Sequence, residues 1–133
     1  SRLADWNVLR RTHAKRYSDA LASTNCQLPG IADKAVPVWH IYAVRVDGDR
    51  EAIRASMGEQ GVSTGVHYPV PLHLQSAYAE LGYAAGSLPV TEKVADSIIS
   101  LPMFPELTDD QIGRVVDVLG TCIDESDVEN SGT

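Results

Sequence analysis

Several kinds of residue are scarce in this sequence, and each scarcity excludes a class of protein. There is no apolar run of about 18 residues, which excludes a membrane-spanning helix. Two cysteines, Cys26 and Cys122, are too few for a disulfide scaffold and lack metal-site spacing, so we expect reduced thiols and a cytoplasmic protein. The 11 basic and 18 acidic residues give a net charge of −7, so neither nucleic acid nor a membrane is an expected partner.

The residues that are present have the composition of a folded domain. Of the 133 residues, 44% are hydrophobic and 22% are charged, which is enough for one core without metal or disulfide staples. The sequence opens without Met and inside a helical pattern, so we expect a piece of a longer protein. We divide it into a leading helix over 1–22, a domain over 23–120 and a disordered acidic tail over 121–133.

Hydrophobic periodicity predicts helices and strands in alternation. Strands are expected at 36–46, 62–67 and 100–104, and helices at 3–22, 49–61, 74–82, 91–99 and 108–119. The strand over 36–46 is apolar on both faces and is therefore expected at the centre of the sheet. The predicted fold class is α/β (α+β), a small three-stranded sheet covered by helices, with the strand direction left open.

Local signals mark several helix ends. Asp49 and Thr91 have the side chains of N-cap residues, and Gly61 is placed as the glycine that follows a helix C-terminus. Thr108 and Gln111 have the spacing of a capping box, which predicts the start of the last helix.

No complete catalytic motif is found. The glycine-rich patterns of dinucleotide and phosphate sites are absent, as is the Gly-x-Ser-x-Gly elbow. Lys15, Lys34 and Lys93 lie in polar or exposed settings and are expected to be solvated charges, because a Schiff-base lysine needs a desolvated pocket. His67 and His73 are six residues apart with prolines between them, so a zinc pair is not expected.

One segment, residues 61–75, differs from routine structural sequence. A short strand ends in His67 and Tyr68, and Pro69 and Pro71 then keep the chain extended before a helix. Titratable and aromatic side chains on such a rigid connection are typical of a ligand-facing element. Packing of His67 and Tyr68 at the domain surface is the alternative, and the residues alone leave both open.

Four separated stretches carry a resemblance to a known family. They are residues 5–17 (DWNVLRRTHAKRY), 39–46 (WHIYAVRV), 61–75 (GVSTGVHYPVPLHLQ) and 100–108 (SLPMFPELT). In this order they resemble the C-terminal small domain of the DegT/DnrJ/EryC1/StrS sugar aminotransferases, which are fold-type I enzymes that use pyridoxal phosphate (PLP).

The resemblance implies an activity and divides it between two domains. In the family, the Schiff-base lysine and most of the PLP site belong to a large domain that this sequence lacks. Neither PLP binding nor aminotransferase activity is therefore expected of this sequence alone. No catalytic, cofactor-binding or metal-binding residue is therefore assigned here, and His67 and Tyr68 are the matching substrate-binding positions. The parent enzyme is expected to be a homodimer that moves an amino group, from glutamate, to a keto sugar linked to a nucleotide.

Finer implications of the resemblance remain hypotheses. The form of the 61–75 motif favours a reaction at the sugar 3-position. The alternatives are a PLP-dependent sugar dehydratase of the same family, a non-catalytic binding module with the small-domain fold and, more weakly, a metal site at His67 and His73. The first helix is expected to lie at the domain junction, with Trp6 and Tyr17 on an apolar surface that the large domain shares.

Overall fold

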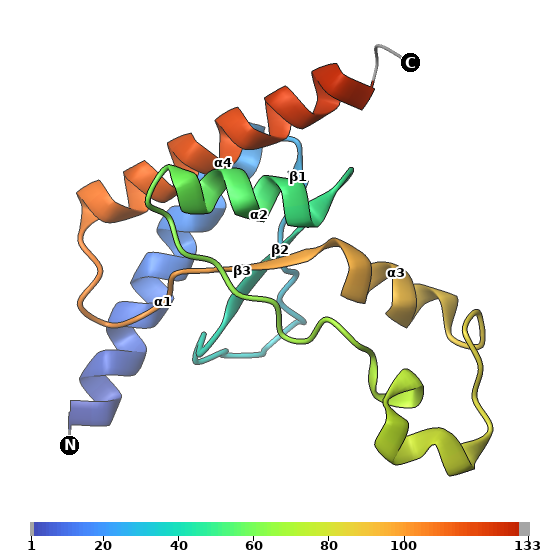
Figure 1. Cartoon of the computed structure of the whole chain (residues 1–133). Coiled ribbons are helices and arrows are strands. Elements are labelled where there is room, and N and C mark those ends of the chain that lie inside the picture. Colours follow the sequence, from blue (N-terminus) through green and yellow to red (C-terminus); the bar gives the residue numbers. More distant parts are fainter. Residues whose placement is uncertain (1, 131–133) are drawn as a thin grey trace.

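The computed structural model describes residues 2–130 of the chain (Figure 1). In chain order the elements are α1 (Arg2–Ala20), η1 (Leu21–Ser23), β1 (Cys26–Gln27), β2 (Tyr42–Val46), α2 (Arg50–Glu59), η2 (Leu72–Leu74), η3 (Ser76–Leu81), α3 (Pro89–Ser97), β3 (Ile98–Leu101) and α4 (Asp109–Asn130), where η denotes a 3-10 helix. The predicted class, a small three-stranded sheet covered by helices, is confirmed.

The three strands form an antiparallel sheet in the order β1-β2-β3. Tyr42 lies opposite Leu101, and Arg45 lies opposite Ile98. The strand that the sequence placed at the centre is therefore central. Side chains of β2 alternate between buried and half-buried, so only one face of this strand is fully covered.

The core fills the space between that face and helices α1, α2 and α4. The strands contribute Tyr42, Val44 and Val46 from β2 and Ile99 and Leu101 from β3. The helices contribute Ala14, Tyr17, Ile53, Met57, Ile112, Val115, Val118, Leu119, Cys122 and Ile123. Placing these helices on one face of an antiparallel sheet gives an α+β arrangement.

All three predicted strands differ from the structure, and the one predicted over 100–104 lies at Ile98–Leu101. The strand predicted over 36–46 begins only at Tyr42, because Trp39 has a φ of 53° and Val36 and Val38 are exposed. Residues 62–67 form no strand and make one isolated bridge, between Gly65 and Ser100. The two-residue strand β1 was not predicted, since so short an element leaves no periodic signal.

Two predicted helix starts are confirmed by their hydrogen bonds. Asp49 Oδ1 accepts from the backbone N–H groups of Glu51 at 2.9 Å and Ala52 at 3.0 Å. The Gln111 N–H donates to Thr108 Oγ1 at 3.2 Å, and the Thr108 N–H donates to Gln111 Oε1 at 3.0 Å. Both sets satisfy N–H groups that the first helical turn leaves without a partner.

The predicted cap at Thr91 is wrong. Helix α3 begins at Pro89, two residues earlier, and Leu88 occupies the cap position without a side-chain hydrogen bond. Proline suits the first helical position, because its φ is already helical and its missing N–H would have no helical partner there.

The disordered tail predicted from residue 121 is wrong for residues 121–130. Helix α4 continues to Asn130, and Cys122 and Ile123 are buried. They extend the apolar stripe of Ile112, Val115 and Leu119 by another helical turn. Residues 131–133 of that predicted tail lie outside the described residues.

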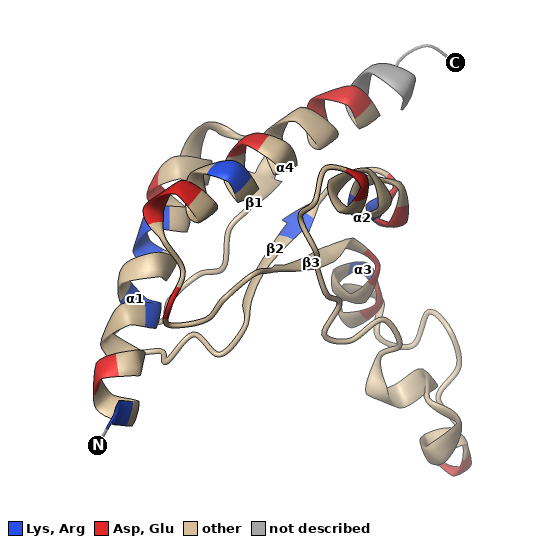
Figure 2. Cartoon of the chain, turned by 60° about the vertical axis from the view of Figure 1, so that its left-hand side comes forward, with Lys and Arg blue, Asp and Glu red and all other residues tan. Residues whose placement is uncertain are grey.

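An arm projects from the core over residues 68–88 (Figure 1). The helix predicted over 74–82 is here two 3-10 helices, η2 and η3, and none of the side chains of η3 is buried. Gly82 ends the second one with a φ of +73°, as the sequence indicated. Figure 2 shows few charged residues on the arm, where Glu80 is the one carboxylate between residues 68 and 88.

Candidate functional site

A helix C-terminus directs the chain toward the site. Gly61, with a φ of +81°, follows α2, and its N–H donates to the Gly58 carbonyl at 3.0 Å. The N–H of Val62 donates to the Met57 carbonyl at 2.9 Å. These two bonds form a Schellman motif, which confirms the predicted role of Gly61 and turns the chain toward β3.

The connection over 62–67 is then fastened from two sides. Gly65 and Ser100 exchange backbone hydrogen bonds of 3.0 and 2.8 Å at the free edge of β3. From α2, Arg54 donates to the Thr64 carbonyl at 3.1 Å and to its hydroxyl at 3.3 Å. The backbone before His67 is therefore fixed to a buried strand and to a helix.

The His67 ring lies against this fixed backbone. Its Nδ1 is 2.9 Å from Ser100 Oγ, and a Cβ added to Gly65 would lie 2.8 Å from His67 Cε1. Gly65 thus leaves the space that the ring occupies. His67 is held in this way and still exposed, while Tyr68 is 70% exposed and meets its ring edge-on at 5.6 Å between centroids.

A shallow groove of about 390 Å³ has His67 in its lining. It lies along the start of β2, the 62–67 connection and the segment that follows β3. Its lining residues are His40, Ile41, Ser63, Thr64, Gly65, His67, Ser100, Leu101, Pro102 and Met103. Two imidazoles and three hydroxyls beside apolar side chains offer both hydrogen bonding and apolar contact to a small polar ligand.

Helix α1 holds the segment that forms one wall of this groove. The Tyr17 hydroxyl donates to the Pro102 carbonyl at 3.0 Å, and His13 Nε2 contacts the Pro105 carbonyl at 3.0 Å. Burial, followed by the nearby Tyr42, raises the pKa of Tyr17, so its hydroxyl keeps the proton that it donates. The two side chains therefore anchor residues 102–105.

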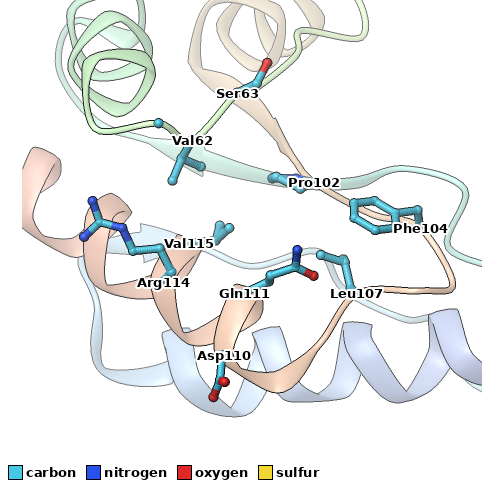
Figure 3. A pocket seen from close by; sticks show the side chains of 10 residues that line it. Val62, Ser63, Pro102, Phe104, Leu107, Asp110, Gln111, Arg114 and Val115 are labelled. Carbon is cyan, nitrogen blue, oxygen red and sulfur yellow. The ribbon is translucent and has the colours of Figure 1, made fainter.

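A second hollow of about 470 Å³ adjoins the groove (Figure 3). Ser63 and Pro102 line both hollows. Val62, Leu107 and Val115 give this one an apolar lining. In Figure 3 the Ser63 hydroxyl points away from these three side chains.

His73 belongs to the arm and not to the groove. Its Nε2 contacts Glu92 Oε1 at 2.9 Å, and Glu92 also accepts from the N–H groups of Gly86 at 2.8 Å and Leu88 at 3.0 Å. These donors, the Gly86 N–H first, lower the pKa of Glu92. His67 and His73 therefore have different partners, and Glu92 ties the arm to α3.

The three lysines are exposed, as predicted. Lys15 pairs with Asp19 at 2.7 Å on the surface of α1, Lys34 lies in the loop before β2, and Lys93 lies on α3. None of them is in the desolvated pocket that a Schiff-base lysine requires. The residues present do not fit the lysine site of a PLP enzyme.

Neither a metal centre nor a membrane span is found in the described part of the chain. Over residues 2–130, no group of three or more His, Cys, Asp and Glu side chains could hold a metal ion. Within that range, no helix is long and apolar enough to cross a membrane.

The chain matches the model of the DegT/DnrJ/EryC1/StrS aminotransferase family over residues 1–120. It therefore belongs to this family. Among similar proteins is a pleiotropic regulatory protein from Geobacillus stearothermophilus, which is 43% identical over 84% of this chain and 31% of the relative. A dTDP-3-amino-3,4,6-trideoxy-alpha-D-glucose transaminase from Streptomyces venezuelae is 39% identical over 88% of this chain and 31% of the relative.

A solved structure supports the same fold. The crystal structure of S. venezuelae DesV, in complex with a ketimine intermediate, superposes with a TM-score of 0.83 at 38% identity. The match covers 89% of this chain and 32% of that one. The chain thus spans about a third of the length of these relatives.

Sequence reasoning predicted His67 and Tyr68 as substrate-binding positions, which stays a prediction, and it missed what surrounds them. Ser100 was assigned only to a strand, although it supplies the hydroxyl beside His67. Gly65 was not distinguished from other glycines, and His40 was not placed near His67. The contact between Gly65 and Ser100 joins residues 35 positions apart, and no local pattern reports such a pairing.

We predict that Gly65→Ala displaces the His67 ring without unfolding the chain. The new Cβ would overlap Cε1 of a side chain that can rotate, so the cost in unfolding free energy should be about 1 kcal/mol or less. NMR spectra of the imidazole should show His67 leaving Ser100. The control is Gly58→Ala on α2, where nothing lies within 4 Å, and an unmoved His67 in Gly65→Ala would contradict the packing described here.

We also predict that the arm loosens in acid. The folded-state pKa of Glu92 is lowered, so its stabilisation is complete above the ordinary carboxyl pKa and is lost as pH falls through the lowered value. Amide exchange at Gly86 and Leu88 should accelerate over that range. Glu92→Gln should abolish this pH dependence and Glu80→Gln should keep it; identical pH profiles for all three chains would refute the prediction.

Proposed function

We propose that this chain is the C-terminal small domain of a PLP-dependent aminotransferase that acts on a keto sugar linked to a nucleotide, in amino-sugar biosynthesis. The observation that carries the proposal is the position of His67. This residue of the family-like motif over 61–75 is hydrogen-bonded to Ser100, lines a groove that has both polar and apolar side chains, and is still exposed.

The groove has the chemistry that a sugar requires. Sugars present many hydroxyl groups, each of which both donates and accepts hydrogen bonds. His67, His40 and the hydroxyls of Ser63 and Thr64 offer matching groups at the groove surface. In this proposal His67 binds and orients the sugar, and Tyr68 contributes its hydroxyl and an exposed ring face.

The rest of the catalytic apparatus is assigned to the remainder of the parent protein. The three lysines here are exposed, and the relatives are about three times as long as this chain. PLP supplies the electron sink of an aminotransferase, and it would be held by the large domain. The proposed parent is a homodimer with glutamate as amino donor, and the 3-position of the sugar is the proposed site of transfer.

Two surfaces of this chain expose apolar side chains and are suited to contact with the remainder of the parent protein. On the projecting half of α1, Leu3 is 58% exposed, Val8 53% and Trp6 37%. On the arm, Leu72 and Leu81 are exposed and charged residues are few. Tyr17 does not belong to such a surface, because it is fully buried in the core of this chain.

The test is to express the parent protein with the coding sequence that precedes Ser1. It should show the visible absorbance of bound PLP and transfer an amino group from glutamate to a dTDP- or UDP-linked keto sugar. His67→Ala should lower kcat/KM about ten- to a hundredfold, as expected for loss of a hydrogen bond to the substrate, while Lys93→Ala should not.

Three results would contradict the proposal. An extended protein that binds PLP without a lysine at the cofactor and removes a sugar hydroxyl would be a dehydratase. A gene that begins just before Ser1 would indicate a stand-alone binding module. Unchanged kcat/KM in His67→Ala would remove His67 from the sugar site.

A further inference from the structure

We infer that Ser100 is a positioning residue that fixes the tautomer of His67. Its hydroxyl donates a hydrogen bond to Nδ1, so the proton of the neutral imidazole stays on Nε2. His67 is thereby presented to its ligand as a hydrogen-bond donor. The inference rests on the proposed function only in calling that ligand a sugar.

The contact that carries this inference is short, and its serine side is buried. Ser100 is 5% exposed and lies in β3, whose residues are all buried. Its Oγ is 2.9 Å from His67 Nδ1. A hydrogen bond of this length to a buried group holds the ring more firmly than one that competes with water.

The direction of the bond follows from the other partners of Ser100. Its backbone N–H and carbonyl are both paired with Gly65. Among the described residues, His67 Nδ1 is the one hydrogen-bond partner of the Ser100 hydroxyl. If Nδ1 carried the proton and donated to Oγ, the hydroxyl hydrogen would have no acceptor among the described residues, which is the costlier arrangement.

The packing of the ring sets where Nε2 points. Nδ1 and Nε2 lie on different sides of the imidazole, so a ring whose Nδ1 faces Ser100 directs Nε2 away from β3. Gly65 lies against Cε1, and Arg54 holds the neighbouring Thr64. The ring therefore cannot flip without losing the Ser100 bond, and Nε2 stays directed away from β3 on a side chain that is exposed.

This arrangement defines the ligand chemistry of the site. A neutral imidazole with its proton on Nε2 donates to an oxygen acceptor, such as a sugar hydroxyl, a carbonyl or a phosphate oxygen. In this state Nε2 has no free lone pair and cannot accept a proton. His67 thus binds and orients a ligand oxygen, and it does not serve as the resting general base.

The tautomer can be measured on the 133-residue chain itself. Long-range hydrogen–nitrogen NMR of histidine-labelled protein, at about pH 8.5 where ordinary imidazoles are neutral, separates protonated from unprotonated ring nitrogens. We expect a protonated Nε2 and an unprotonated Nδ1. In Ser100→Ala both shifts should move to values averaged between the two tautomers, and Ser100→Thr, which keeps the hydroxyl, should restore the native pattern.

The result that would overturn the inference is a proton on Nδ1 in the native chain, or unchanged nitrogen shifts in Ser100→Ala. If Ser100→Ala fails to fold, Gly65→Ala provides a second route, because it moves the ring and leaves the hydroxyl in place. Averaged shifts there support the inference, and a native pattern contradicts it. No sugar is needed, so failure of the aminotransferase assay would leave this measurement unaffected.

Discussion

The backbone pairing of Gly65 with Ser100 is the constraint on which the candidate site depends. One side of β3 pairs with β2 and completes the sheet. On the other side of β3, Ser100 pairs with Gly65 of the 62–67 connection in one isolated bridge. Because the same residue, Ser100, also supplies the hydroxyl beside His67, one position of β3 fixes both the path of the connection and the orientation of its histidine.

The core explains why β3 can serve as this fixed edge. Ile99 and Leu101 belong to an apolar core that helices α1, α2 and α4 close, so moving the strand would expose that surface to water. Tyr17 and His13 then hold the segment after β3 through its carbonyl groups. The groove is therefore built between two elements that are fastened to the same core. Tyr68 follows His67 in the chain, is exposed and begins the arm.

Most of the correct sequence predictions concern features that depend on neighbours in the chain, although the local cap signal at Thr91 failed. Asp49, Gly61 and the pair Thr108–Gln111 act within a few residues of themselves, and their roles are confirmed. Strand direction, the late start of β2 and the continuation of α4 depend on partners far away in sequence, and these were open or wrong. At the candidate site, the motif pointed to His67 and Tyr68, whose substrate role stays a prediction. Ser100 and Gly65 acquire their roles only through a long-range pairing, which the motif does not report.

Residues 62–67, although not a strand, should be held as firmly as the sheet. Native-state hydrogen exchange of the Gly65 amide tests this most directly. We predict that Gly65 exchanges as slowly as Val44 in β2 and far more slowly than Val70 on the exposed arm. Exchange of Gly65 at the rate of Val70 would contradict the account, because His67 would then lie on a segment free to leave β3.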